Sequence, residues 1–238
     1  MAEKVVIGNA ELWHGDCREI LPTLPECDLI LTDPPYGIAK QMADGIGHKW
    51  DHEWDDTTPP DWLFGLMLEK GRDLIVWGGN YYKLPPSRGW LSWFKPDAVP
   101  TMAQLEMAWT SMDMNAKQLK HSIAATNAER VGHPTQKPVR VMEWSLSFCP
   151  DAKTICDPFM GSGTTGVACA RMGLQFVGIE RERKYFDIAC RRIEQAYAQP
   201  RLFEDAKVGA GDTAVQGDML LPANAPGKPT AANEPNEG

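Results

Sequence analysis

The chain has 238 residues, of which 43% are hydrophobic and 24% are charged. A chain of this length can bury a complete α/β core within one domain. It contains no apolar run long enough to cross a bilayer and no signal-peptide pattern near its start, so we expect a cytoplasmic protein. The net charge of −8 neither supports nor excludes a nucleic-acid partner, because residues 204–238 carry half of it.

Six cysteines are scattered through the chain without a Cys-x-x-Cys pair, and five histidines show no metal-ligand spacing. Most of the cysteines lie in apolar segments, where a thiol behaves as a small hydrophobic group. The cysteines are Cys17, Cys27, Cys149, Cys156, Cys169 and Cys190. We therefore expect buried, reduced thiols and no metal site.

Four apolar runs without polar alternation predict strands that are buried on both faces of a parallel sheet. They are residues 28–32, 73–77, 153–156 and 175–179. A helical spacing of apolar residues appears between the last two runs, at 164–171, and again after them, at 183–198. Residues 89–95 and 104–110 predict a further, antiparallel pair of strands. Strand, glycine turn, helix, strand and helix in succession indicate a βαβ unit.

Most of the chain, residues 1–203, is predicted to form one folded domain that contains two weakly patterned segments. Residues 38–60 are rich in Gly, Asp, His, Lys and Trp without a period, which is typical of a long mobile surface loop. Residues 111–132 are also weakly patterned. Residues 204–238 are rich in Ala, Pro, Gly and Asn with almost no aromatics, so we expect a disordered tail.

A glycine-rich loop, Asp157-Pro-Phe-Met-Gly161-Ser-Gly163-Thr-Thr-Gly166, follows a predicted strand and opens a predicted helix. Its glycines let the backbone turn tightly and approach a ligand. Glu180 ends the next strand, where a carboxylate can accept both hydroxyls of a ribose. The Asp157 carboxylate would repel the pyrophosphate of NAD but attract the ammonium of a methionine-derived cofactor. The loop favours a cationic sulfonium nucleoside, with a glycine turn used only for packing as the alternative.

A second loop, Asp33-Pro34-Pro35-Tyr36, leaves the end of another predicted strand, where ligands bind in open α/β sheets. The two prolines fix φ and donate no hydrogen bond, so the loop presents carbonyl oxygens. A carboxylate and a carbonyl at a fixed separation match the two hydrogens of an aromatic amine. Accepting both would turn the nitrogen lone pair toward an electrophile, and Tyr36 would stack on the ring. A stiff turn with a surface tyrosine is the alternative.

Together these segments resemble the DNA N6-adenine/N4-cytosine amino-methyltransferases of the permuted order, the beta class, in which the catalytic loop precedes the glycine loop. The resemblance runs from about residue 11 to residue 198 and implies a three-layer αβα sandwich. Its sheet is expected to be mostly parallel and seven-stranded, the Rossmann-like fold of methyltransferases that use S-adenosylmethionine. The matching segments are residues 14–16, 33–36, 76–80, 90–95, 106–110, 133–138 and 157–163.

The resemblance also implies a role for each matching residue, with S-adenosylmethionine as the cofactor and a base flipped out of double-stranded DNA as the substrate. The residues expected to carry catalysis are Asp33, Pro34, Pro35 and Tyr36. Asp16 is expected near the cofactor's adenine, and Thr135 and Lys137 near its methionine end. The complete set expected to bind the cofactor is Asp16, Thr135, Lys137, Asp157, Phe159, Gly161, Ser162, Gly163, Thr164 and Glu180.

Positive side chains gather in the two weakly patterned segments, and in residues 38–60 they are interleaved with Trp50 and Trp54. Such a mixture suits phosphate contact and stacking, although ordinary solvated lysines are the alternative. The residues expected to contact DNA are Lys40, Lys49, Lys117, Lys120 and Arg130. Family members with defined recognition sequences usually carry a longer insertion than residues 111–132. We therefore expect a short target-recognition region there, and both site-specific and low-specificity methylation stay open.

The leading hypothesis is methylation of the exocyclic N6 of adenine, which Asp33 at the first loop position favours by resemblance. Methylation of cytosine N4 stays open, because the acceptor pair reads only an amine. An RNA base, a protein amide, or an idle nucleic-acid-binding module of the same fold are weaker alternatives. The sequence leaves the oligomeric state open, including a homodimer.

Overall fold

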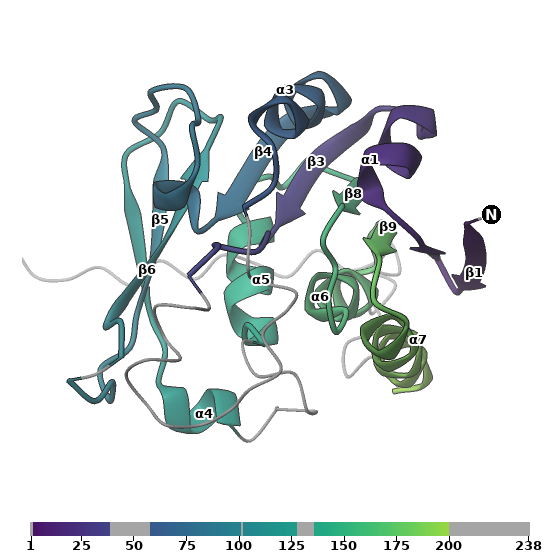
Figure 1. The fold of residues 1–238 in the computed structure, drawn as a ribbon. Coiled ribbons are helices and arrows are strands. Elements are labelled where there is room, and N and C mark those ends of the chain that lie inside the picture. The colour runs from purple at the N-terminus through teal and green to yellow at the C-terminus, as the bar shows by residue number, and fades with distance from the viewer. Residues whose placement is uncertain (1, 39–57, 101, 128–135, 200–238) are drawn as a thin grey trace, which may run out of the picture. The chain divides into compact units, whose positions relative to one another are not determined.

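One nine-stranded sheet organises the part of the chain that the structure describes, residues 2–38, 58–100, 102–127 and 136–199. The computed structural model orders the strands β1-β2-β9-β8-β3-β4-β6-β5-β7 (Figure 1). The strands are β1 (Glu3–Ile7), β2 (Ala10–His14), β3 (Cys27–Thr32), β4 (Gly71–Trp77), β5 (Trp90–Phe94), β6 (Leu105–Thr110), β7 (Lys117–Lys120), β8 (Thr154–Asp157) and β9 (Gln175–Glu180). The pairs from β2 through β9, β8 and β3 to β4 are all parallel, so the centre of the sheet is a parallel sheet.

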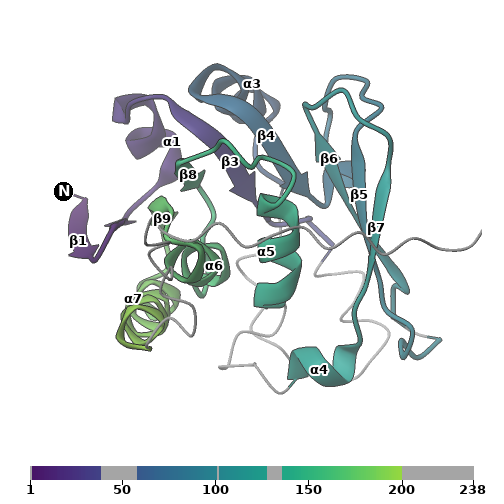
Figure 2. The same ribbon diagram turned by 180° about the vertical axis from the view of Figure 1, so that it is seen from behind.

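Helices cover both faces of this sheet (Figures 1 and 2). The helices are α1 (Cys17–Ile20), α3 (Asp61–Lys70), α4 (Ile123–Asn127), α5 (Val139–Leu146), α6 (Thr164–Met172) and α7 (Arg183–Ala198), with short 3-10 turns η1 (Leu21–Thr23) and η3 (Gly79–Tyr81). Helices α1 and α3 lie on one face, and α5, α6 and α7 lie on the other. The domain therefore has the three layers that the sequence predicts.

The central strands are apolar on both faces because each face meets a different helical layer. On β3, Leu29 and Leu31 pack in the core shared with α5, α6 and α7, whereas Ile30 packs in the core shared with α1 and α3. The neighbouring β4 repeats this alternation with Ile75 and Val76. Side chains of a strand alternate between faces, so a continuous apolar run is what a strand buried between two layers requires.

Helix α6 begins at a glycine that the packing requires. Gly163 has a φ of 81°, in the left-handed region that residues with a Cβ rarely adopt. A Cβ at this position would lie 2.9 Å from the Cβ of Ala189 on α7. Glycine here lets the loop after β8 turn directly into α6 while α7 packs closely against it.

The fold class and the predicted elements of the βαβ unit are confirmed. The four apolar runs form β3, β4, β8 and β9, the two helical segments form α6 and α7, and β5 pairs antiparallel with β6. Residues 111–132, predicted to be weakly patterned, contain β7 and α4, with residues 128–132 outside the described part. Most of the loop at 38–60 and all of the tail at 204–238 also lie outside it, so those boundaries and that of the domain at 1–203 stay predictions.

The predicted number of strands needs correction, because the described residues form nine strands and not seven. The hairpin of β1 and β2 joins the sheet beside β9, and β7 joins it beside β5. Strands β1 and β7 are largely exposed. Their sequences therefore lack the continuous apolar run by which a buried strand is recognised.

The packing of β9 gives the first prediction. Phe176 is 1% exposed, and Phe176→Ala is expected to lower the free energy of unfolding by about 3–5 kcal/mol, because a cavity remains in the core. Urea denaturation measures this change. The control is Met172→Ala at a residue that is 44% exposed, where a change within about 0.5 kcal/mol is expected. Equal effects of the two variants would contradict the burial of Phe176.

Candidate active site

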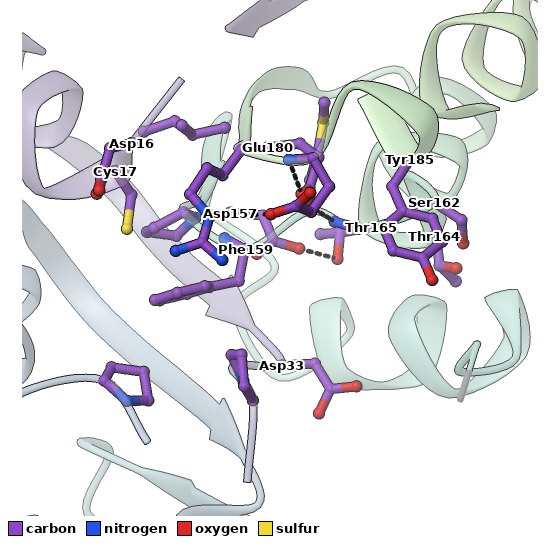
Figure 3. A pocket seen from close by; sticks show the side chains of 18 of the residues that line it. Asp16, Cys17, Asp33, Asp157, Phe159, Ser162, Thr164, Thr165, Glu180 and Tyr185 are labelled. Atoms are coloured by element: carbon purple, nitrogen blue, oxygen red, sulfur yellow. Dashed lines mark hydrogen bonds and ion pairs between the residues drawn. The ribbon is translucent and has the colours of Figure 1, made fainter. Parts of the chain in front are cut away.

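A cavity of about 240 Å³ opens where β3, β8 and β9 end (Figure 3). Asp33 directly follows β3, Asp157 ends β8 and Glu180 ends β9. Because these strands are parallel neighbours, their carboxyl ends bring the three acidic residues to one edge of the sheet. The predicted site residues that line the cavity are Asp16, Asp33, Pro35, Lys137, Asp157, Phe159, Gly161, Ser162, Thr164 and Glu180.

Glu180 closes the glycine loop onto the end of β9. Its carboxylate accepts the backbone N–H of Gly161 at 2.9 Å and that of Glu182 at 2.7 Å. Burial raises the pKa of Glu180 to about 7, although these two hydrogen bonds oppose the shift. The carboxylate is thus oriented by the loop that it holds.

Asp157 is held by three donors from separate elements. Its oxygens accept the hydroxyls of Thr32 and Thr165, each at 2.7 Å, and the backbone N–H of Phe159 at 3.0 Å. Burial raises the pKa of Asp157 to about 6. Asp157 is only 2% exposed, but it still lines the cavity. It therefore presents a fixed acceptor surface to whatever the cavity binds.

Two buried carboxylates beside one cavity favour a cationic ligand. Burial raises the pKa of both Glu180 and Asp157, so their charged forms lack full compensation from the protein. A positive charge in the cavity would stabilise both charged forms. The cavity residues therefore fit the cationic sulfonium nucleoside that the sequence predicts, with a carboxylate at Glu180 suited to ribose hydroxyls.

Asp16 lines another part of the same cavity. Figure 3 shows Asp16 and Tyr185 at opposite ends of the pocket. Asp16 is the N-cap of α1 and accepts both the backbone N–H of Arg18 at 2.9 Å and its Nε at 3.0 Å. The hydrogen bond from the Arg18 side chain lowers the pKa of Asp16 below its ordinary value. Asp16 therefore stays a charged acceptor at neutral pH.

The buried ammonium of Lys137 joins residues of the loop 33–36. Lys137 donates to both carboxylate oxygens of Asp33 at 2.8 Å and to the hydroxyl of Tyr36 at 2.8 Å. Tyr36 in turn donates its hydroxyl to Asp33 at 2.6 Å. Burial opposes the charge of Lys137, yet Asp33 and Glu106 raise its pKa above the ordinary value. Lys137 therefore binds the loop 33–36, and it also lines the cavity in which the resemblance implies a place near the methionine end of the cofactor.

Two further charged residues complete this group, and sequence reasoning missed both. Glu106 on β6 lies 3.0 Å from the ammonium of Lys137 and also pairs with Lys95. Burial opposes ionisation, but Lys137 and Lys95 hold the pKa of Glu106 at about 2. Both residues belong to segments that carry the family resemblance. The signal was therefore present, but a charged residue on a predicted strand did not by itself indicate its partner.

Tyr36 packs tightly among aromatic rings. It stacks on Tyr81 with ring centroids 4.9 Å apart and meets Tyr82 edge-on at 6.5 Å. A Cβ on Gly78 would lie 2.2 Å from the Tyr36 ring, so glycine makes this approach possible. The Tyr82 hydroxyl donates to the carbonyl oxygen of Pro34 at 2.8 Å. Tyr82 therefore fixes the position of this carbonyl group.

The remaining predicted residues are placed as follows. Gly163 begins α6 and does not line the cavity. Lys117 and Lys120 are exposed on β7. Thr135, Lys40, Lys49 and Arg130 lie outside the described residues. Within those described, no group of three or more His, Cys, Asp or Glu could hold a metal ion, and no helix has the length and apolarity needed to cross a membrane.

Known proteins share this fold. The PvuII DNA methyltransferase, described as cytosine-N4-specific, has 17% sequence identity and a TM-score of 0.52, over 86% of this chain and 89% of that one. The complex of M1.HpyAVI with SAM has 23% identity and a TM-score of 0.51, over 77% of this chain and 99% of that one. The sheet and its cavity thus define an α/β fold of the DNA methyltransferase type.

Sequence comparisons find similar proteins as well. The type II methyltransferase M.HinfI of Haemophilus influenzae is 27% identical over 81% of this chain and 70% of its own length. M.ScaI of Streptomyces caespitosus is 24% identical over 77% of this chain and 81% of its own. The model of the DNA methylase family matches residues 92–191, which include the glycine loop and Glu180. Residues 92–191 thus match the DNA methylase family, and most of the chain is similar to type II methyltransferases.

The raised pKa of Glu180 predicts a pH-dependent stability. The folded pKa of about 7 lies above the ordinary value of 4.5, so the folded state binds protons more tightly than the unfolded state. The resulting stabilisation is complete below the unfolded pKa and is lost as the pH rises through about 7. Its size is on the order of 1–3 kcal/mol, because one pKa unit corresponds to about 1.4 kcal/mol.

The variant Glu180→Gln removes this titration. Gly161 and Glu182 donate to different oxygens of Glu180, so the single amide oxygen of glutamine can replace only one of the two acceptors. Urea denaturation at about pH 5.5 and about pH 8 should show that the wild type loses more stability than the variant over this interval. Because all other titrating groups are common to both proteins, the difference between their pH dependences of stability reports the titration of Glu180. The same pH dependence in both proteins would refute the raised pKa.

Proposed function

We propose that this protein methylates the exocyclic N6 of adenine in double-stranded DNA, with S-adenosylmethionine as the methyl donor. The match of residues 92–191 to the DNA methylase family and the similarity to M.HinfI support methyl transfer to DNA. The observation that carries the proposal is the juxtaposition of the Asp33-Pro34 acceptor pair with a cavity suited to a cationic nucleoside. The two loops therefore offer one site for an amine and another for the group that methylates it.

The cavity residues account for binding of the cofactor. Glu180 would accept the ribose hydroxyls, and Asp157 would stabilise the positive charge. Phe159 lines the cavity beside them, and Asp16 offers a charged acceptor toward the adenine. When bound, S-adenosylmethionine supplies an electrophilic methyl group. The contribution of the chain is to bind, orient and neutralise this cation.

The loop residues account for activation of the amine. An oxygen of Asp33 and the carbonyl of Pro34 would each accept one amine hydrogen, which directs the nitrogen lone pair away from the ring. Both groups already accept hydrogen bonds in the structure, from Lys137 and Tyr82 respectively. Their acceptor directions are thus fixed by the fold before any substrate binds. Such preorganisation lowers the cost of reaching the reactive geometry.

Tyr36 would hold the flipped base by stacking. It lies two residues after Pro34, and its ring belongs to a group of packed aromatic residues with Tyr81 and Tyr82. Burial raises the pKa of Tyr36 well above its ordinary value, so the ring carries a neutral hydroxyl. A neutral aromatic face stacks on any planar base, independent of its sequence context.

Contact with the DNA backbone would come from exposed basic side chains. Lys117 and Lys120 lie on β7, which pairs with β5 away from the cofactor cavity. Their charges would bind phosphates and would position the duplex without reading its sequence. Lys40, Lys49 and Arg130 are proposed for the same role on the sequence pattern alone.

Methylation of cytosine N4 is the second candidate. The acceptor pair binds an amine and does not read the ring that carries it. The similar fold of a methyltransferase described as cytosine-N4-specific favours keeping this candidate. Adenine is preferred because Asp33, at the first position of the loop, resembles the adenine-specific members of the family.

The test is methyl transfer from radiolabelled S-adenosylmethionine to unmethylated duplex DNA, followed by digestion to nucleosides. We expect label in N6-methyladenine. Label in N4-methylcytosine would retain the mechanism and overturn the choice of base. Binding of the cofactor without label in any DNA would overturn the proposal in favour of an RNA, a protein amide or an idle module.

Replacing Tyr36 separates base binding from cofactor binding. Tyr36→Ala is expected to lower kcat/KM for DNA by about 5- to 150-fold, because one stacking contact is worth about 1–3 kcal/mol. The affinity for S-adenosylmethionine, measured by calorimetry, should stay unchanged. Tyr36→Phe is the matched control, since it keeps the stacking face and should keep most of the activity. If Tyr36→Ala also loses cofactor affinity, the proposed stacking role is wrong.

A further inference from the structure

Four buried or half-buried charges form a continuous chain that ends at the catalytic carboxylate. Lys95 pairs with one oxygen of Glu106, the other oxygen of Glu106 lies 3.0 Å from Lys137, and Lys137 lies 2.8 Å from Asp33. The side chains of Lys95 and Lys137 are 8% and 4% exposed. Two ammonium groups and two carboxylates balance each other, so the cluster is neutral as a whole.

The ammonium of Lys137 has more acceptors than it can serve. A protonated lysine carries three N–H donors. Four oxygens lie within 3.0 Å of its Nζ: both oxygens of Asp33, the hydroxyl of Tyr36 and one oxygen of Glu106. Lys137 can therefore leave one oxygen of Asp33 and still donate three hydrogen bonds.

Activation of the target amine requires that Lys137 release one oxygen of Asp33. In the structure both oxygens of Asp33 accept from Lys137, and one of them also accepts from Tyr36. A carboxylate whose oxygens are both engaged by an ammonium is a weakened acceptor for a neutral amine. The negative charge of Glu106, whose carboxylate lies 3.0 Å from the Lys137 ammonium, would offset this attraction.

We propose that Glu106 is a positioning residue that draws the Lys137 ammonium off one oxygen of Asp33, so that this oxygen can accept a hydrogen of the target amine. The inference rests on the proposed function. Lys95 pairs with the other oxygen of Glu106, and the Lys95 ammonium lies 4.5 Å from the centre of the Trp93 ring. The pair of Lys95 and Glu106 thus strengthens Asp33 as a hydrogen-bond acceptor without touching the substrate.

The structure offers a pair of variants that separates positioning from folding. Glu106→Gln leaves two buried ammonium groups against one carboxylate, so it is expected to destabilise the protein. Adding Lys95→Met restores a neutral cluster and should recover stability. In this double variant Asp33 is the only carboxylate partner of Lys137. The attraction between the two side chains is then not offset, and Asp33 remains a weak acceptor for the target amine.

We expect the double variant to unfold at a urea concentration close to that of the wild type and to bind S-adenosylmethionine with unchanged affinity. Its rate of methyl transfer in a single turnover should fall by about 10- to 100-fold, less than the roughly 100- to 1,000-fold loss that follows removal of a preorganised group at the reacting atoms, because Glu106 acts only through Lys137. The KM for DNA should change little. A structural role of Glu106 would instead give recovery of rate and stability together.

A second variant keeps the proposal testable if the double variant fails to fold. Glu106→Asp retains the charge of the cluster but withdraws the carboxylate from Lys137 by one methylene, so a reduced transfer rate with normal cofactor binding is expected. Wild-type transfer rates in either folded variant would overturn the positioning role alone. A wild-type protein that methylates no DNA would overturn the proposed function as well.

Discussion

Burial of the central strands between two helical layers is the constraint on which the site depends. Strands β3, β8 and β9 must be apolar along their length because each face meets a helical layer, so charged residues are confined to their ends. Since the strands are parallel neighbours, those ends lie together. Asp33, Asp157 and Glu180 therefore lie together because burial of the strands leaves only their ends for charged residues. No direct attraction between the three side chains is needed.

Electrostatics then divides the site into two parts. Around the cavity, burial raises the pKa of Glu180 to about 7 and that of Asp157 to about 6, which leaves an environment that favours a cation. Around the catalytic loop, carboxylates and ammonium groups are paired, and Lys137 and Lys95 hold the pKa of Glu106 at about 2. One half of the site thus gains from an incoming positive charge, while the other half is already balanced and suits a neutral amine.

The aromatic residues connect this chemistry to substrate binding. Tyr82 orients the Pro34 carbonyl, and Tyr81 supports the ring of Tyr36. These contacts depend on η3 after β4, where the left-handed Gly78 leaves room for Tyr36. The loop 33–36 is consequently held from a neighbouring strand and does not rely on its two prolines alone.

The sequence by itself determined the parallel core, the glycine loop with Glu180 and the acceptor loop beginning at Asp33, because continuous apolar runs and motif spacing are local properties of the chain. It did not determine the edge strands β1 and β7, whose exposed residues lack such a run. Only the tertiary structure decided that Lys137 binds Asp33, 104 residues away, and that Glu106 and Lys95 extend this pairing. Ion pairs between distant segments leave no periodic pattern in the sequence. The order of the strands in the sheet determines which distant residues come into contact.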